Sequence, residues 1–472
     1  MVMEVEVLTG PPGCGKSTVL RNEAAGRPGL YLFAYPTEKL LLEQAAAFQS
    51  DMPPSSIVLE AHSGSPGRGV VQKKLDAAAA QVAQSRARHA VVLTTHASLM
   101  SADLSGYKGW HFRIDEVPAA IQSGAEKSKI VRGYLDEHFE LAPVGSEGWH
   151  VVSPKAATAI ATWRTDDGLS NGQVELLNNA QRPNRVFIEA PTFSRPFEWV
   201  SVWSPHALEG LAGSVTIAGA SYMTSIGGLV AQPYVEFRPR ILPMARSGIP
   251  VIRIHYFTAG HEGSTALWRR SEGRKFVVQL CDYLVSKRSD LGFWAANEPV
   301  AHLLEHRVSG AQLTPKAAGQ NAHRDKMSCA YIYSARPTPN DTPLKALFGL
   351  TDDQIRVARQ DEDVLQFVMR GAIRNADHAG EYDIYLYSRT QAERLADQLS
   401  DSGVGKVEVV QADAGFMLAS RSQSLGPALP EAVVSPTGRR VRRSSAKRTE
   451  RRHAKAVQEG RAPGRPGRPR KQ

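Results

Sequence analysis

Nine residues near the start of the chain, GPPGCGKST, have the types and spacing of a phosphate-binding loop. Glycines let backbone N–H groups turn toward a phosphate, Lys16 could reach the β- and γ-phosphate oxygens of a nucleoside triphosphate, and Ser17 could ligate Mg²⁺. Residues 3–9 alternate apolar and acidic side chains, which indicates a strand, and a helix is expected after the loop. We therefore expect a nucleotide to be held by Gly10, Pro11, Pro12, Gly13, Cys14, Gly15, Lys16, Ser17 and Thr18.

Two adjacent carboxylates, Asp115 and Glu116, end the strand-like stretch GWHFRIDEVP. Hydrolysis of a bound triphosphate needs one carboxylate to help hold Mg²⁺ and a neighbouring group to orient the attacking water. Asp115, together with Ser17, is the candidate for the first role, and Glu116 is the candidate for the second. A solvated pair of acids at a strand end is the alternative interpretation.

A third group of candidates, Gln366, Arg370 and Arg374, lies in a segment of helical composition, DQIRVARQDEDVLQFVMRGAIRN. Their spacing of four residues would place all three on one face of a helix. Such a face could point at the γ-phosphate, where a guanidinium neutralises the charge that develops in the transition state. Either Arg370 or Arg374 could be that arginine, and an amphipathic helix with a polar face is the alternative.

Strands that alternate with helices are expected to position these groups. GLYLFAY, IVLEAHSG, AVVLTT and GWHFRIDEVP are strand-like, whereas EKLLLEQAAAFQ and residues 70–89 have helical composition. This alternation predicts an α/β fold with a parallel sheet. Functional groups of such sheets gather at the carboxyl ends of the strands, where the glycine loop, Pro36-Thr37, Thr95 and Asp115 fall.

The same alternation returns in the second half of the chain, which predicts two parallel-sheet domains in tandem. We expect a first domain over residues 1–228, with an insertion at about 120–200 whose role the sequence does not reveal. Connecting strands are expected over 229–274 and a second domain over 275–415. Residues 416–472 are expected to form a linker and a disordered basic tail.

The order of the motifs resembles that of a superfamily 2 helicase of the DEAD/DEAH-like group. GPPGCGKST matches motif I, and IDEVP resembles motif II with Val117-Pro118 in place of its usual last letters. AYPTEKLLLEQ resembles motif Ia, LTTHASLM the threonine-containing strand end that follows, and TIAGAS motif III. GFWAAN stands where motif IV would, LTPKAAGQNAHRD resembles motif V, and QFVMRGAIRN resembles motif VI. The short layout resembles helicases of the phage or mobile-element type.

The resemblance implies two RecA-like domains that close on ATP and Mg²⁺ and that move along or unwind nucleic acid, with DNA favoured over RNA. It places Gly319 in the nucleotide site. Hydroxyls and backbone N–H groups at strand ends are common phosphate donors. The residues expected to contact nucleic acid are Pro36, Thr37, Thr95, His96 and Asn321.

The net charge of +10 is concentrated at the end of the chain, where 14 of the 57 Lys and Arg residues lie between Gly438 and Gln472. The rest of the chain is near neutral, so its contacts with nucleic acid would depend on local grooves. Arg465 and Arg468, in GRPGRP, partly resemble an AT-hook, in which arginine enters a narrow minor groove. A disordered basic tail that binds any polyanion is the alternative.

Composition argues against a membrane or secreted protein. No apolar run approaches the ~18–20 residues of a membrane span, and no secretory signal precedes the first strand. The cysteines, Cys14, Cys281 and Cys329, give neither a metal spacing nor a disulfide framework. We expect a cytoplasmic protein, nucleoid-associated or in a host cytoplasm, and a nuclear one only from a eukaryotic source. Two other functions stay open: an AAA+-type remodeller, and a nucleotide-gated DNA-binding protein that acts through its basic tail.

Overall fold

The computed structural model contains two parallel sheets and one antiparallel sheet. It describes residues 2–64, 71–126, 129–145, 148–155, 163, 168–181, 184–189, 197–315, 322–337 and 341–417. Gly319, Asn321, Arg465, Arg468 and the expected linker and tail from residue 418 onward lie outside these residues. Phe416 and Met417, which were expected to begin the linker, are instead buried in the cores of the second domain. Within the described ranges, no helix has both the length and the hydropathy of a membrane span.

The first sheet has seven parallel strands in the order β12-β1-β11-β5-β2-β4-β3. Its strands are β1 (Met3–Thr9), β2 (Leu30–Tyr35), β3 (Ile57–Glu60), β4 (Ala90–Thr95), β5 (His111–Asp115), β11 (Ser214–Ala218) and β12 (Val235–Ile241). β2 and the first four residues of β4 are continuously apolar because both faces of these strands are buried.

Helices cover both faces of this sheet. One face packs on α1 (Lys16–Gly26) and α2 (Glu38–Asp51). The other packs on α3 (Val71–Ser85), α4 (His96–Leu99), α7 (Ile226–Ala231) and the short 3-10 turns η1 (Ser105–Tyr107), η3 (Pro205–Leu208) and η4 (Tyr222–Thr224). Along β2 the side chains of Leu32 and Ala34 enter one core, and those of Tyr31 and Phe33 enter the other, as the alternation of a strand requires.

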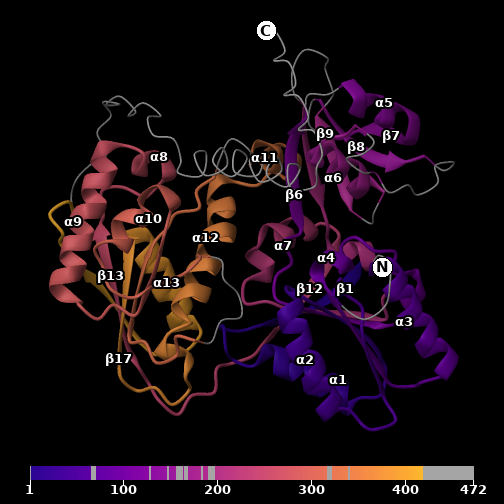
Figure 1. Ribbon diagram of the computed structural model, residues 1–472, viewed down its shortest axis with the longest axis horizontal. Coiled ribbons are helices and arrows are strands. Elements are labelled where there is room, and N and C mark those ends of the chain that lie inside the picture. The colour runs from indigo at the N-terminus through magenta and orange to yellow at the C-terminus, as the bar shows by residue number, and fades with distance from the viewer. Residues whose placement is uncertain are drawn as a thin grey trace, which may run out of the picture.

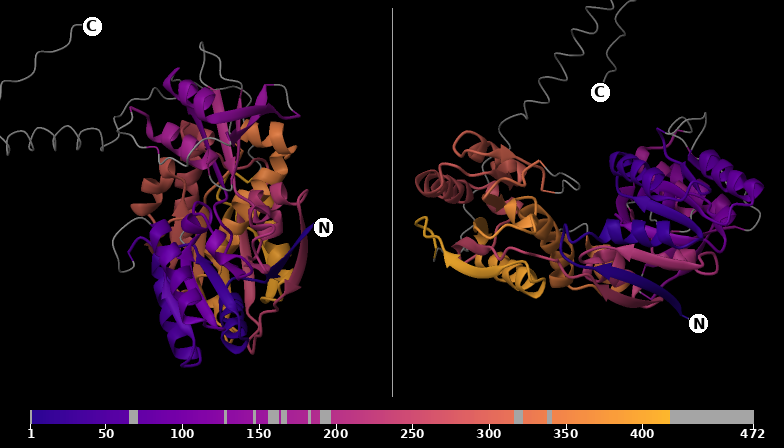
Figure 2. Two further views of the ribbon diagram at one scale, coloured as in Figure 1. Left: turned by 90° about the vertical axis from the view of Figure 1, so that its right-hand side faces the viewer. Right: turned by 90° about the horizontal axis from the view of Figure 1, so that it is seen from below.

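The second sheet has six parallel strands in the order β15-β14-β16-β17-β13-β18. Its strands are β13 (Val251–Thr258), β14 (Phe293–Ala296), β15 (Ala311–Gln312), β16 (Ser328–Ile332), β17 (Glu381–Ser388) and β18 (Lys406–Gln411). One face packs on α8 (Thr265–Trp268), α9 (Ser271–Lys287) and α10 (Glu298–Glu305). The other packs on α12 (Asp352–Val368), η6 (Ala372–Arg374) and α13 (Arg389–Asp401). The prediction of an α/β fold with two RecA-like parallel-sheet domains in tandem is confirmed, and Figure 2 shows the two lobes side by side in its right-hand view.

The region expected to connect the domains, 229–274, contributes a strand to each sheet. β12 pairs with β1 at the edge of the first sheet, and β13 lies between β17 and β18 inside the second. Only residues 242–250 lie between these two strands. The passage from one domain to the other is therefore short.

The insertion between β5 and β11 is an antiparallel sheet in the order β6-β10-β9-β8-β7. It consists of β6 (Ile121–Glu126), α5 (Lys129–His138), β7 (Phe139–Pro143), β8 (Trp149–Pro154), α6 (Asn171–Ala180), β9 (Arg185–Glu189) and β10 (Phe197–Val202). One face packs on α5 and α6, and the other meets α7 and the second domain's α11 (Thr342–Phe348). The insertion lies above the first sheet and beside α11 in Figure 1.

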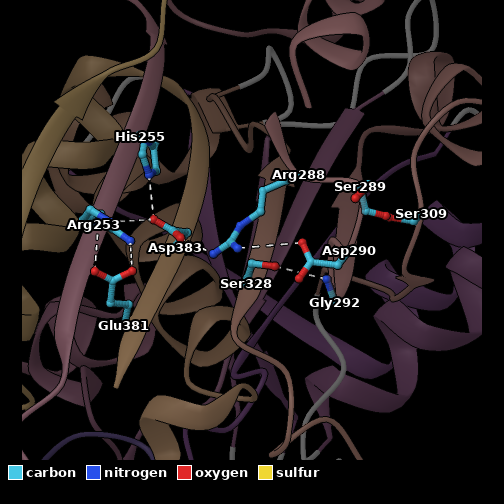
Figure 3. A network of polar contacts seen from close by, with 10 residues as sticks. All are labelled: Arg253, His255, Arg288, Ser289, Asp290, Gly292, Ser309, Ser328, Glu381 and Asp383. Atoms are coloured by element: carbon cyan, nitrogen blue, oxygen red, sulfur yellow. Dashed lines mark hydrogen bonds and ion pairs between the residues drawn. The ribbon is translucent and has the colours of Figure 1, made fainter. Parts of the chain in front are cut away.

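A polar cluster lies at the amino ends of β13 and β17, which Figure 3 shows. We call it the Asp383 cluster; its members are Arg253, His255, Arg288, Glu381 and Asp383. The buried carboxylate of Asp383 accepts hydrogen bonds from Arg253 Nε at 3.0 Å, from His255 Nε2 at 2.8 Å and from Arg288. The cluster lies away from the carboxyl ends of the strands, where the functional groups are expected. It connects β13 and β17 to the end of α9, and we interpret it as structural.

Candidate nucleotide site

The glycine-rich loop joins the end of β1 to the start of α1, as the sequence predicts. Gly13 has a φ of 88°, which an L side chain rarely adopts, and a Cβ there would lie 3.1 Å from Cγ of Arg374. Gly15 is the N-cap of α1 and has no side chain to cap the helix, so the first N–H groups of α1 are open to an anion. Lys16 Nζ donates to the carbonyl oxygens of Gly10 at 2.6 Å and Pro11 at 3.0 Å, which holds its ammonium over the loop.

The two acids of β5 have different surroundings. Ser17 Oγ lies 2.8 Å from each carboxylate oxygen of Asp115. Burial raises the pKa of Asp115 to about 6, although the Ser17 hydrogen bond and the Lys16 charge oppose it. Burial, with the charges of Asp115 and Glu362, raises the pKa of Glu116 to about 7, against the opposing charges of Lys16 and Arg374. Glu116 has a φ of 65°, and a non-glycine residue in this region stores strain of the kind that clusters at functional sites.

The residues present fit a divalent cation. Among the described residues, no cluster of three or more His, Cys, Asp or Glu side chains could hold a metal ion. Mg²⁺ does not require one, because it is usually bound through one or two carboxylates together with phosphate oxygens and water. Asp115 and Ser17 present hard oxygen atoms side by side, and a cation would offset the cost of burying the Asp115 carboxylate, which its raised pKa reflects.

A cavity of about 290 Å³ brings the groups of the two domains together. From the first domain it is lined by the loop and α1 start from Pro12 to Thr18 other than Cys14, by residues 115–117 and by residues 218–220. The second domain contributes the side chains of Arg324, Glu362, Gln366, Arg370 and Arg374. Every described residue predicted to be catalytic therefore lies on one cavity. Cys14 instead packs toward the core of the second domain.

The helix expected to carry Gln366, Arg370 and Arg374 on one face ends before the arginines, so that interpretation is wrong. α12 stops at Val368, and Arg374 lies in the separate turn η6. The Tyr382 hydroxyl donates to the carbonyl of Val368 at 3.0 Å, and a Cβ on Gly371 would lie 2.1 Å from that hydroxyl oxygen. The chain thus turns tightly against Tyr382. The three side chains share the cavity because of this turn rather than because of helical spacing.

The two arginines differ in their surroundings. Arg370 is 3% exposed, donates through Nη1 to the carbonyl of Thr314 at 3.3 Å, and lies over the ring of Phe367. Arg374 lies against Gly13 of the loop. Its buried Nε has no hydrogen-bond partner among the described residues. A buried donor without a partner is costly, and an acceptor in the cavity would satisfy it.

Of the residues predicted to contact nucleic acid, the structure describes Pro36, Thr37, Thr95 and His96, which lie at the carboxyl edge of the first sheet, outside the cavity lining. Thr37 is exposed and caps α2 by accepting from the Leu40 N–H at 3.3 Å, and the half-buried Pro36 precedes it. Thr95 caps α4 in the same way. The prediction for His96 is corrected: its side chain is buried, and its Nε2 lies 2.8 Å from the backbone oxygen of Asp115. Burial lowers the His96 pKa to about 4, so the residue is a neutral support beneath the acidic pair.

Two side chains of the cavity escaped sequence analysis. Arg324 lies within the segment that resembles motif V, and Glu362 lies one helical turn before Gln366. Glu362 Oε1 accepts from Gln366 Nε2 at 2.7 Å. The four-residue spacing of Glu362 and Gln366 was the available signal, since such residues share a helix face.

The chain matches no protein-family model and no curated protein by sequence. Solved structures similar to it include an XPD helicase (TM-score 0.48, 10% identity, covering 86% of this chain and 96% of that one). Another is Xpd4 of S. tokodaii (TM-score 0.44, 11% identity, covering 86% of this chain and 96% of that one). A DEAD box protein from the hyperthermophile Methanococcus jannaschii is also similar (TM-score 0.28, 10% identity, covering 87% of this chain and 88% of that one). Because the scores and identities are low, the case for a function rests on the side chains of the cavity.

Proposed function

We propose that the protein is a nucleic-acid-dependent ATPase that uses hydrolysis between its two parallel-sheet domains to translocate along DNA or RNA or to unwind it. The observation that carries this proposal is the shared cavity. Lys16, Ser17 and the acidic pair line it from one domain, and Gln366, Arg370 and Arg374 line it from the other. A site assembled from two domains links the state of the bound nucleotide to the angle between those domains.

Each group has a role that follows from its chemistry. Lys16 and the free N–H groups of α1 bind the phosphates. Ser17 and Asp115 would hold Mg²⁺, which when bound would neutralise phosphate charge. Glu116 orients the attacking water and accepts its proton. Burial supports this role, because a carboxyl whose pKa is raised to about 7 is a better base than an exposed one.

We assign the stabilisation of the transition-state charge to Arg374 rather than to Arg370. Arg374 lies against the loop and has a buried Nε without a partner among the described residues. Arg370 is anchored by Thr314 and Phe367, which suits a support for the turn that carries Arg374. Gln366, which donates to Glu362 and lines the cavity together with Glu116, is our candidate for a second contact to the attacking water.

The test is ATP hydrolysis with and without single-stranded DNA and single-stranded RNA, using the full chain. We expect one polymer to raise the rate at least several-fold, and Lys16→Ala to abolish both basal and stimulated hydrolysis. Equal rates with and without either polymer would contradict the nucleic-acid-dependent motor. Hydrolysis that survives Lys16→Ala would come from a contaminant.

The alternatives make different predictions. An AAA+-type remodeller forms rings and has no second RecA-like domain, whereas this chain has a second parallel sheet that supplies its own arginines to the cavity. That arrangement favours a protein that works without a ring. A DNA-binding protein that acts through its tail would keep its DNA affinity in Lys16→Ala and lose it, with its salt dependence, when residues 438–472 are removed.

A further inference from the structure

The linker from β12 to β13 is bound at its start to the first domain and to the glycine-rich loop. The N–H of Leu242 donates to the carbonyl of Thr9 at 2.8 Å, and its side chain packs on the core between the first sheet and α1. A Cβ on Gly10 would lie only 2.4 Å from the Leu242 oxygen. The loop and the linker therefore touch at the backbone.

Two residues later, the linker belongs to the second domain. Met244 is 8% exposed and is part of the core beneath α12 and α13. Ser247 N and Gly248 N both donate to the carbonyl of Ala376, at 3.0 and 2.9 Å. The change from one domain to the other thus takes place at Pro243.

Arg246 binds the backbone on both sides of Arg374. Its Nη1 donates to the carbonyl of Ile373 at 2.7 Å, and its Nη2 donates to the carbonyl of Asn375 at 2.8 Å. Its Nε donates to Gly248 O at 3.1 Å, within the linker itself. Weaker contacts at Nη2 and Nη1 reach His378 O at 3.5 Å and Met244 Sδ at 3.4 Å.

The turn that carries Arg374 needs such support. η6 is three residues long, and a single 3-10 turn has poor hydrogen-bond geometry and little stability of its own. A guanidinium has five N–H donors in a fixed fork, so one side chain can hold several carbonyls in a set arrangement, whereas the three donors of a lysine rotate on a flexible stem.

We propose that Arg246 is a positioning residue, which holds the turn 372–375 so that Arg374 faces the glycine-rich loop. This inference rests on the proposed function, because it assigns to Arg246 the placement of the arginine that acts on the nucleotide. Leu242 is hydrogen-bonded to Thr9 at the end of β1, and Arg246, four residues later, is hydrogen-bonded to the turn. The linker therefore connects the strand that precedes the loop with the turn that carries Arg374. Arg246 and the turn lie on the same side of Pro243, so they move together with the second domain if the domains rotate there.

The test compares Arg246→Ala and Arg246→Lys with a matched control, Arg238→Ala. Arg238 lies on exposed β12 and pairs with Glu4, away from the cavity. We expect Arg246→Ala to lower kcat by about 10- to 100-fold with KM changed less than about 3-fold, because a displaced charge is felt mainly in the transition state. Arg246→Lys should fall between Arg246→Ala and the wild type, and Arg238→Ala should match the wild type.

A double-mutant cycle separates positioning from general structural support. In an Arg374→Ala background, Arg246→Ala should change kcat by less than about 2-fold, since its effect acts through the missing side chain. Hydrogen exchange supplies a readout without turnover. The amides of Arg374 and Asn375, bonded to Gly371 and Ala372, should exchange faster in Arg246→Ala than in Arg238→Ala.

The outcomes distinguish this inference from the function on which it rests. If the wild type hydrolyses ATP and Arg246→Ala equals Arg238→Ala in kcat and in exchange, the inference is wrong and the function stands. Additive losses in the cycle would likewise overturn it. If the wild type hydrolyses nothing, the function falls, and exchange alone decides whether Arg246 holds the turn. If thermal unfolding shows that Arg246→Ala does not fold, Arg246→Lys decides, and wild-type values there would refute the inference.

Discussion

Arg370 and Arg374 line the same cavity, yet their neighbours predict different consequences of removing them. Arg374→Ala should lower kcat by about 10³-fold, the range of a guanidinium that stabilises phosphoryl transfer, with a loss of unfolding free energy of about 1 kcal/mol or less. Arg370→Ala should instead lower the unfolding free energy by about 2 kcal/mol, because it leaves the Thr314 carbonyl without its donor and a hole beside Phe367. Steady-state hydrolysis and urea unfolding of the two variants measure both effects. If Arg370→Ala has the larger effect on kcat and Arg374→Ala the larger effect on stability, our assignment is reversed.

Single residues could be predicted where chemistry requires a pattern along the chain. The loop, through Pro12 to Thr18 other than Cys14, and the acidic pair at the end of β5 line one cavity because parallel strands end at the same edge. His96 could not be placed in this way: a polar residue after a strand can face solvent or turn inward, and here it lies beneath Asp115. Arg324 lies in the segment that resembles motif V, but its place on the cavity depends on how the two domains pack, which the segment alone does not reveal.

The end of α12 is an element-scale feature with a measurable energetic cost. Gly371→Ala would put a methyl group 2.1 Å from the Tyr382 hydroxyl oxygen, and such overpacking should destabilise the protein by about 1–3 kcal/mol. Gly26→Ala is the matched control, because no atom lies within 4 Å of its new Cβ and its φ is unremarkable; we expect a change of less than about 1 kcal/mol.

Removing the Tyr382 hydroxyl checks the cause of this effect. In a Tyr382→Phe background, Gly371→Ala should cost less than in the wild type but still destabilise, since the closest clashing atom is absent while the ring carbons Cε2 and Cζ, 2.5 Å from the new Cβ, remain. Urea unfolding of the four proteins in this cycle gives the comparison. Equal costs in both backgrounds would mean that something other than the tyrosine hydroxyl ends the helix.

The Asp383 cluster of Figure 3 gives the second domain a defined dependence on acid. Burial opposes ionisation of Asp383, but hydrogen bonds from His255 and Arg253 and the charge of Arg288 lower its pKa to about 2, from an ordinary 3.8. Because the folded pKa is the lower one, the ionised carboxylate stabilises the fold above pH 4, and this contribution is lost as pH falls from about 4 to 2.

Asp383→Asn tests that contribution. At neutral pH we expect it to lower the unfolding free energy by about 2 kcal/mol, because Arg253 and Arg288 lose a shared charged partner. The difference between wild type and variant should shrink steadily below pH 4 in urea unfolding at a series of pH values. A difference that stays constant down to pH 2 would show that ionisation of Asp383 is not its source.

Strands could be predicted where both of their faces are buried, because such strands appear in the sequence as runs of mostly apolar residues. LYLFAY and AVVLTT are such strands, and their alternation with helices was sufficient to predict both parallel sheets. The end of α12 was not predictable. Residues 369–374 contain no proline, and the need for Gly371 comes from Tyr382, which reaches the turn only in the folded chain.

The insertion joins the two domains through an apolar contact, which we call the α11 contact. It includes Phe187 and Val200 from the insertion, Val230 from α7, and Leu344 and Phe348 from α11. The rings of Phe187 and Phe348 meet edge to face with centroids 5.4 Å apart. The insertion interrupts the first domain in sequence, but through this contact it packs on α11 of the second domain.

A double-mutant cycle on Phe187→Ala and Phe348→Ala measures this contact. Each substitution should lower the unfolding free energy, and the pair should show a coupling of about 1 kcal/mol, as expected for an aromatic pair in contact. Phe33→Ala with Phe348→Ala is the control pair, since Phe33 lies in the core on α1 and α2 and should not couple. A coupling indistinguishable from the control would mean that the insertion does not depend on α11.

The arrangement of whole domains was the least accessible from sequence. Residues 229–274 are strand-rich, but only pairing reveals that β12 completes one sheet and β13 the other. The insertion lacks the helix–strand alternation of its surroundings, and its antiparallel order depends on contacts between strands far apart in the chain, such as β10 with β6.

The chain passes from one domain to the other at Pro243, directly beside the glycine-rich loop of the candidate nucleotide site. A rotation between the domains at this point would have its axis close to that site. Rotation about a point displaces a group in proportion to its distance from that point, so the loop strand, bonded to Leu242, travels little. The insertion and α11 lie in the upper part of Figure 1, away from α1, and a rotation at Pro243 would have to shift the α11 contact between them. A rotation that leaves the phosphate-binding loop in place would therefore be detected first at the α11 contact.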